Sequence, residues 1–139
     1  MRIKAINLTI ILLLVSSAAL AASDFQFTLD NNGVLDYTLD SVSSPLVYDD
    51  TLPVNDPVIN LIAGKRYGVT VVNYQTHPFQ LINKGSNASE DIVLLSQGGE
   101  NGTLENDLSV DWVDDGSGLI EFTVSETLIQ QLKSDPGVP

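Results

Sequence analysis

The sequence predicts an all-β fold, an antiparallel Greek-key β-sandwich with one short C-terminal helix. Short apolar segments alternate with polar residues at every second position, as in Leu35, Tyr37 and Leu39. This period is typical of strands with one buried face. Clusters of Asp, Asn, Gly and Pro separate the segments, and a length of 139 residues is typical of one domain.

The N-terminus has the pattern of a cleaved secretory signal peptide. A short basic start precedes an apolar run from Ile6 to Val15, and Ala19 and Ala21 match an A-x-A cleavage site. A membrane anchor is the alternative, but the uninterrupted apolar core is shorter than the about 20 residues that a spanning helix needs. We therefore expect a signal peptide at residues 1–21, a single domain at 22–139, and a secreted protein, periplasmic or extracellular.

The start of the mature chain predicts a β-hairpin. Phe25, Phe27 and Leu29 form one apolar face, and a second alternating segment runs from Leu35 to Leu39. The intervening Asp30-Asn31-Asn32-Gly33 is a turn sequence, because Gly readily adopts positive φ. A loop containing Pro and Asp is expected from Ser43 to Pro57.

The central part of the chain predicts further strands. Val58 to Ile62 is apolar apart from Asn60, and the next segment places Tyr67, Val69 and Val71 on one face. Residues 79–82 and 92–95 form two more short apolar segments, which we also expect to be strands.

The C-terminal part predicts one strand and one helix. Leu119 to Val124 alternates, with Phe122 on its apolar face. Ser125 is a suitable N-cap, and the apolar residues that follow have helical spacing, which predicts a helix from Glu126 to about Lys133. Six residues are expected to be largely buried: Trp112, Phe122, Val71, Val69, Ile59 and Leu81.

Composition excludes several classes of site and partner. The chain has no Cys and one His, so a disulfide, a cysteine nucleophile and a three-His zinc site are excluded. After position 21 there are four basic and 18 acidic residues, a net charge of −14. This charge argues against nucleic acid and against an anionic membrane as partners. No recognisable catalytic constellation is present, so we expect a protein that is not an enzyme.

The segment from Asp56 to Leu132 resembles a cupredoxin of the small secreted, plastocyanin-like type. The resemblance rests on Ala63-Gly64-Lys65-Arg66-Tyr67, on the strand that follows, and on Thr76-His77-Pro78-Phe79. Later pieces occur in matching order: Val93-Leu94-Leu95-Ser96, Val110-Asp111-Trp112, and Leu119-Ile120-Glu121-Phe122.

This resemblance implies a metal ligand at His77, which matches the first copper ligand of the family. In complete members a further segment after the short helix carries Cys, a second His and usually Met, and forms the final strand. The sequence reaches Pro139 without these residues, so we expect a truncated or degenerate member. Because blue copper needs a thiolate and two imidazoles, we expect no cofactor for this chain.

Other features have less specific interpretations. His77 is alternatively a surface or half-buried histidine near Asn73, since one imidazole needs partner ligands to hold a metal. The acidic turns, such as Asp114-Asp115-Gly116, suit weak calcium binding by chemistry, but they do not match the spacing of a calcium loop and are interpreted as solvated turns. Asn87 and Asn101 lie in N-x-S/T sequences, which are glycosylation acceptors where the source glycosylates.

Two functional hypotheses follow. The first is a secreted cupredoxin-like domain that resembles small electron-transfer proteins but lacks a complete copper site. The second is a non-catalytic binding or assembly module that is completed by a strand from another chain, with a strand-donating partner or self-association. In either case we expect the strand Leu119–Val124 to lack a neighbour and to expose its edge, with Phe25–Leu29 as an alternative source of cover.

Overall fold

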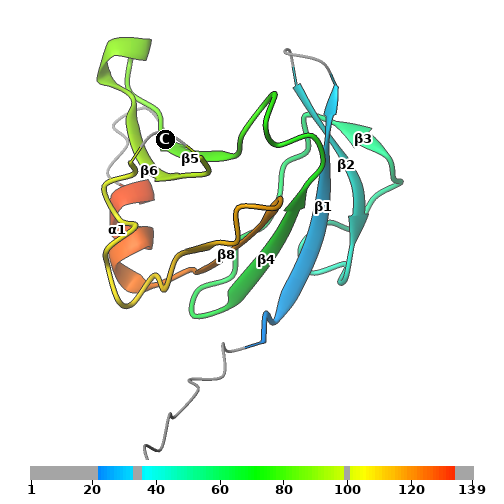
Figure 1. The fold of residues 1–139 in the computed structure, drawn as a ribbon. Helices are drawn as coiled ribbons and strands as arrows, with labels where there is room; N and C mark the ends of the chain where they lie inside the picture. The colour runs from blue at the N-terminus through cyan, green and yellow to red at the C-terminus, as the bar shows by residue number, and fades with distance from the viewer. Residues whose placement is uncertain (1–21, 33–35, 99–100, 134–139) are drawn as a thin grey trace, which may run out of the picture.

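The computed structural model describes residues 22–32, 36–98 and 101–133. The predicted signal peptide at 1–21 and the residues after 133 lie outside this range, as does Gly33 of the predicted turn. In the described range the chain is mostly β, with one α-helix, as predicted (Figure 1).

A six-stranded sheet forms one layer of the molecule. Its order is β3 (Val54–Asn55), β2 (Asp36–Val42), β1 (Phe25–Asn32), β4 (Arg66–Val71), β8 (Leu119–Thr123) and β7 (Val113–Asp114). The predicted hairpin is confirmed, because β1 and β2 pair in antiparallel fashion.

The sheet is mixed rather than antiparallel throughout. β1 pairs with β4 in parallel, with Phe25 opposite Tyr67 and Leu29 opposite Val71. The predicted antiparallel arrangement therefore does not hold at this pair. Alternation along a strand specifies which side chains face the core, but it contains no information on the direction of the neighbouring strand.

The second layer contains β5 (Gln80–Asn83), β6 (Ile92–Ser96) and α1 (Glu126–Lys133), with the short 3₁₀ helix η1 (Ala88–Glu90) between the strands. The helix has its predicted limits, and Leu128 N donates to Ser125 Oγ over 3.2 Å, which confirms the N-cap. Asn83 Nδ2 donates to Gln131 O over 2.8 Å, so α1 is linked to β5.

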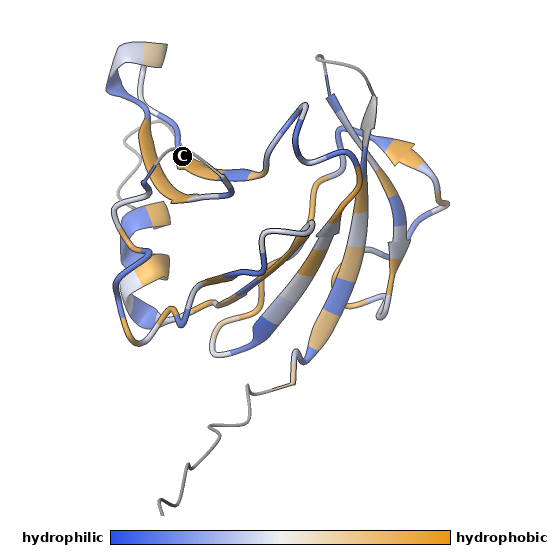
Figure 2. Ribbon diagram, in the orientation of Figure 1, coloured by the Kyte–Doolittle hydropathy of each residue, from blue (hydrophilic) through white to orange (hydrophobic). Residues whose placement is uncertain are grey.

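The core lies between the two layers. Val69, Val71 and Phe122 are buried as predicted, and Figure 2 shows the apolar colour in bands along β1 and β4 and along β6. The other three residues predicted to be core, Trp112, Ile59 and Leu81, are only half-buried. Ile59 and Leu81 border a groove described below, which accounts for their partial exposure.

The predicted strand at Val58–Ile62 is absent from the sheets. Its backbone forms isolated bonds instead: Asn60 N donates to Val47 O over 2.9 Å, and Ile62 N donates to the hydroxyl of Tyr67 over 2.8 Å. Pro57, just before the segment, has no N–H group to donate to a partner strand. The apolar pattern predicted neither pairing nor full burial, because Val58 is exposed and Ile59, Leu61 and Ile62 are half-buried.

The expectation of an exposed edge at Leu119–Val124 is also wrong. β8 lies between β4 and β7, with Glu121 opposite Val113. Beyond β7, Thr123 N donates to Val110 O over 2.7 Å. The segment 110–115 therefore covers the side of β8 that faces away from β4. The predicted alternative is wrong too, because β1 pairs with β2 and β4 rather than with β8.

Candidate functional site

His77 lies in the turn between β4 and β5. The turn begins at Asn73, whose φ of 57° is in the left-handed region. Thr76 N donates to Asn73 O over 2.9 Å, which closes the turn. The imidazole stacks on Tyr37 of β2, with ring centroids 4.5 Å apart and planes 23° apart. Two segments that are 40 positions apart in the sequence thus hold the histidine ring in place.

The Nδ1 atom of His77 is buried and has no hydrogen-bond partner among the described residues. An imidazole nitrogen in this state can donate a proton or bind a metal through its lone pair. In the described part of the chain, no group of three His, Cys, Asp or Glu side chains is arranged to hold a metal ion. The proposal of His77 as a metal ligand therefore rests on one residue and stays a prediction.

Tyr37 packs against the ring of His77, and its hydroxyl also forms hydrogen bonds with the backbone at His77 and Pro78. Its hydroxyl donates to Pro78 O over 2.8 Å, with His77 O 3.2 Å away. Burial raises the pKa of Tyr37 to about 12, because the phenolate loses hydration. The sequence analysis missed this residue as a site residue, since Tyr37 matched the apolar pattern of a strand and its polar end had no local signal.

We expect Tyr37 to ionise well above the usual range of a tyrosine, with a pKa of about 12. The raised pKa means that the folded protein gains stability from the neutral phenol, in full below pH 10 and less as the pH rises towards 12. Ultraviolet titration of phenolate absorbance should show a phase near the upper end of this window. The Tyr37→Phe variant should lack that phase, and an unchanged titration curve in the variant would contradict the assignment.

An apolar groove opens between the two layers. It has a volume of about 170 Å³ and is lined by Phe27, Ile59, Leu61, Phe79, Leu81 and Phe122. A second hollow of about 280 Å³ is lined by Tyr37, His77, Pro78, Gln80 and Ile82. Because successive residues of β5 point to opposite faces, the strand separates an apolar hollow from one that contains His77.

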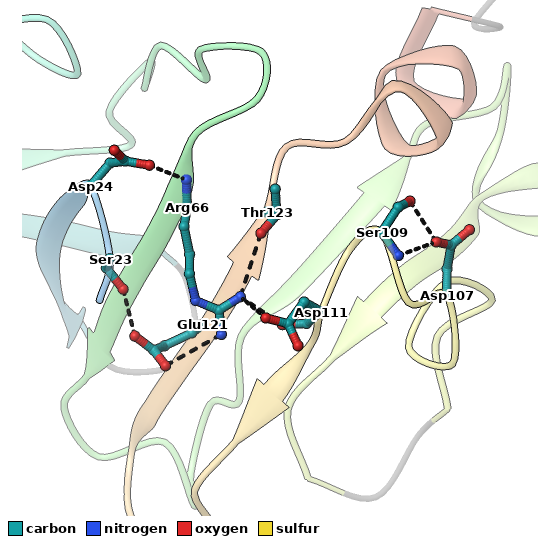
Figure 3. A network of polar contacts seen from close by, with 8 residues as sticks. All are labelled: Ser23, Asp24, Arg66, Asp107, Ser109, Asp111, Glu121 and Thr123. Carbon is teal, nitrogen blue, oxygen red and sulfur yellow. Dashed lines mark hydrogen bonds and ion pairs between the residues drawn. The ribbon is translucent and has the colours of Figure 1, made fainter. Parts of the chain in front are cut away.

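Arg66 forms the centre of a second polar cluster, shown in Figure 3. Its side chain is 5% exposed, and Nη1 contacts Asp111 Oδ2 at 2.7 Å while Nη2 contacts Glu121 Oε2 at 3.4 Å. Nη1 also donates to Asp111 O over 2.9 Å. Since Glu121 accepts from the Ser23 hydroxyl, the cluster connects the start of the described chain to β4, β8 and the 110–115 segment.

A structural role accounts for the contacts of the Arg66 cluster. A buried guanidinium needs paired charges, and its partners come from segments that it holds together. Asp24 adds to this role: Arg66 N donates to its carboxylate over 2.9 Å. That bond, followed by the contact with Lys65, lowers the pKa of Asp24. In the sequence, this cluster is indicated by a cationic residue, Arg66, at the first position of a strand. The partners of Arg66 are far away along the chain, so the sequence does not identify them.

The carboxylates of the acidic turns accept hydrogen bonds from backbone N–H groups of the same turns. Asp114 Oδ1 accepts from Gly116 N over 3.0 Å, and Asp115 Oδ1 accepts from Ser117 N over 2.7 Å. The hydrogen bonds from Ser117 lower the pKa of Asp115. Asn87 uses its side chain in the same way, accepting from Ser89 N over 3.1 Å. These contacts favour the interpretation of these residues as turn formers.

Comparisons with protein-family models, with curated protein sequences and with solved structures found no match to this chain. Among the described residues, no helix has both the length and the hydrophobicity needed to cross a membrane.

Proposed function

We propose that this chain is a secreted, cupredoxin-like Greek-key domain that lacks a complete copper site and has no redox capacity. The observation that carries the proposal is the state of His77: its ring is held against Tyr37 and its Nδ1 is buried without a partner. It follows β4 as the histidine follows a strand in the family that the sequence resembles. The chain has no Cys and no second His, so it cannot supply the thiolate and two imidazoles of a blue-copper centre.

Copper titration tests this proposal. The mature chain, residues 22–139, should develop no intense visible absorption with cupric ion and should show no one-electron redox couple, because a thiolate ligand is required for the first. The His77→Ala variant serves as a control and should give the same spectra. A reversible couple that is present in the parent chain and lost in His77→Ala would overturn the proposal.

A second function is favoured by the groove between the layers. We propose, as the alternative, a non-catalytic binding or assembly module that another chain completes with a strand. In the described part of the chain the second sheet has only two strands, β5 and β6, and the apolar groove lies beside β5. A two-stranded sheet needs a further strand or packing against a helix for stability; α1 is linked to β5, and a donated strand beside β5 would add to that cover. Light scattering over a range of protein concentrations distinguishes self-association from binding of a different chain.

A further inference from the structure

The walls of the apolar groove have the period of a β-strand. Ile59 and Leu61 contribute from the segment before β4, and Phe79 and Leu81 contribute from the start of β5 and the residue before it. On each wall the two residues are separated by two positions, which corresponds to about 6.6–6.8 Å along an extended chain. A helix would present side chains at a different spacing. The groove therefore matches an extended occupant.

The volume of the groove specifies the side chains that fit. About 170 Å³ is available, and a dry apolar cavity of about 150 Å³ is enough to bind benzene. One aromatic ring or one large aliphatic side chain therefore fills the centre of the groove. The face of β5 with Gln80 and Ile82 borders the hollow that contains Tyr37 and His77, so the alternate side chains of an occupant beside β5 meet a polar environment.

The net charge of the chain indicates which charge the occupant should carry outside its apolar positions. The three basic residues whose side chains the structure describes all form ion pairs: Lys65 with Asp24, Arg66 with Asp111 and Glu121, and Lys84 with Asp91. The net charge of −14 after position 21 thus gives a field that attracts cations and opposes a second copy of the same chain.

We propose that the groove beside β5 binds an extended segment of a different protein, with large apolar side chains at alternate positions and Lys or Arg at its ends. This inference rests on the second function proposed above and adds the location and the chemistry of the partner. It also relocates the docking strand from β8, which is covered by 110–115, to β5.

Titration of the isotope-labelled mature chain with a synthetic peptide tests the inference. The probe is the peptide KKTLTFTLTKK, which alternates apolar residues and has basic ends. Backbone amide resonances of Ile59, Leu61, Phe79 and Leu81 should shift on binding, and those of Val113 and Leu119 at the β7–β8 side should not. The scrambled peptide KKTTLFLTTKK should bind at least about tenfold more weakly, since loss of one buried apolar side chain alone has that effect. The acidic peptide DDTLTFTLTDD should also bind more weakly, because its ends carry the same sign of charge as the protein.

A matched pair of variants localises the binding. Leu61→Lys adds a positive charge to the groove wall and should weaken binding of the basic peptide by about tenfold or more. Leu108→Lys makes the same charge change at a residue that is 96% exposed and does not line the groove, and it should leave the affinity unchanged. If Leu61→Lys fails to fold by circular dichroism, the resonance map of the parent chain decides alone.

Three results of the peptide titration would overturn the inference. They are the absence of peptide binding, a resonance map centred on β7 and β8, or equal binding of the basic, scrambled and acidic peptides. Concentration-dependent dimerisation that shifts the groove resonances without peptide would show a second copy as the occupant and would also overturn it. The copper titration is independent of these results, so a redox couple would refute the proposed absence of redox function without affecting the peptide data.

Discussion

Replacing Phe122 with alanine should lower the free energy of unfolding by about 3–5 kcal/mol, the range for removal of a buried Phe side chain. Phe122 is 1% exposed. Its ring centroid lies 5.9 Å from that of Tyr67, 6.4 Å from Phe79 and 6.5 Å from Trp112. The side chain thus connects the six-stranded sheet to the residue before β5 and to the segment before β7, and its removal leaves a cavity that both layers must close.

Denaturant unfolding measures this loss. Leu108→Ala is the control, because a residue that is 96% exposed should change stability by less than about 0.5 kcal/mol. A loss below about 1 kcal/mol for Phe122→Ala would indicate that the opposite face of β8 forms the core, since a one-residue shift in register reverses the two faces of a strand.

Replacing Arg66 with methionine should destabilise the fold by about 3–5 kcal/mol, as expected when one partner of a buried ion pair is removed. The change leaves Glu121, which is 14% exposed, without a cation in a poorly hydrated position. Asp111 is 55% exposed and is stabilised by water after the change, so the main cost arises at Glu121.

A second substitution separates charge from packing. The double variant Arg66→Met with Glu121→Met should recover part of the lost stability, because neither charge is then buried alone. Lys84→Met, which breaks an ion pair whose lysine is 68% exposed, should have a much smaller effect. Equal stability of the single and double variants in a double-mutant cycle would contradict the role of Arg66 as the counter-charge of Glu121.

Local patterns predicted the elements whose causes are local. The helix has the predicted limits because Ser125 caps it and its apolar residues have helical spacing. β4 buries Tyr67, Val69 and Val71, as its alternation indicates. The segment at Val58–Ile62 has the same apolar character but forms isolated hydrogen bonds, and alternation does not reveal whether a partner strand is available.

The candidate site was predictable only in part. The sequence singled out His77 as the one imidazole of the chain, and the structure places it on Tyr37. Nothing in the local sequence of Tyr37 indicates this contact, because the two residues meet through the turn after β4. The groove was missed for the same reason: its six lining residues come from four separate parts of the chain, and each part taken alone has the pattern of an ordinary core segment.

The parallel pair β1–β4 has a consequence for the order in which the chain folds. The pairing of Phe25 requires Tyr67, which is 42 positions later in the chain. The pairing of Arg66 requires Thr123, which is 57 positions later. The β1–β2 hairpin is only marginally stable until these partner strands have been synthesised, as isolated hairpins generally are. During synthesis the central sheet therefore forms only after β8 has emerged. Loop closure over such separations makes folding slow, on the order of milliseconds to seconds, and until it is complete the edge of β1 is available to other chains.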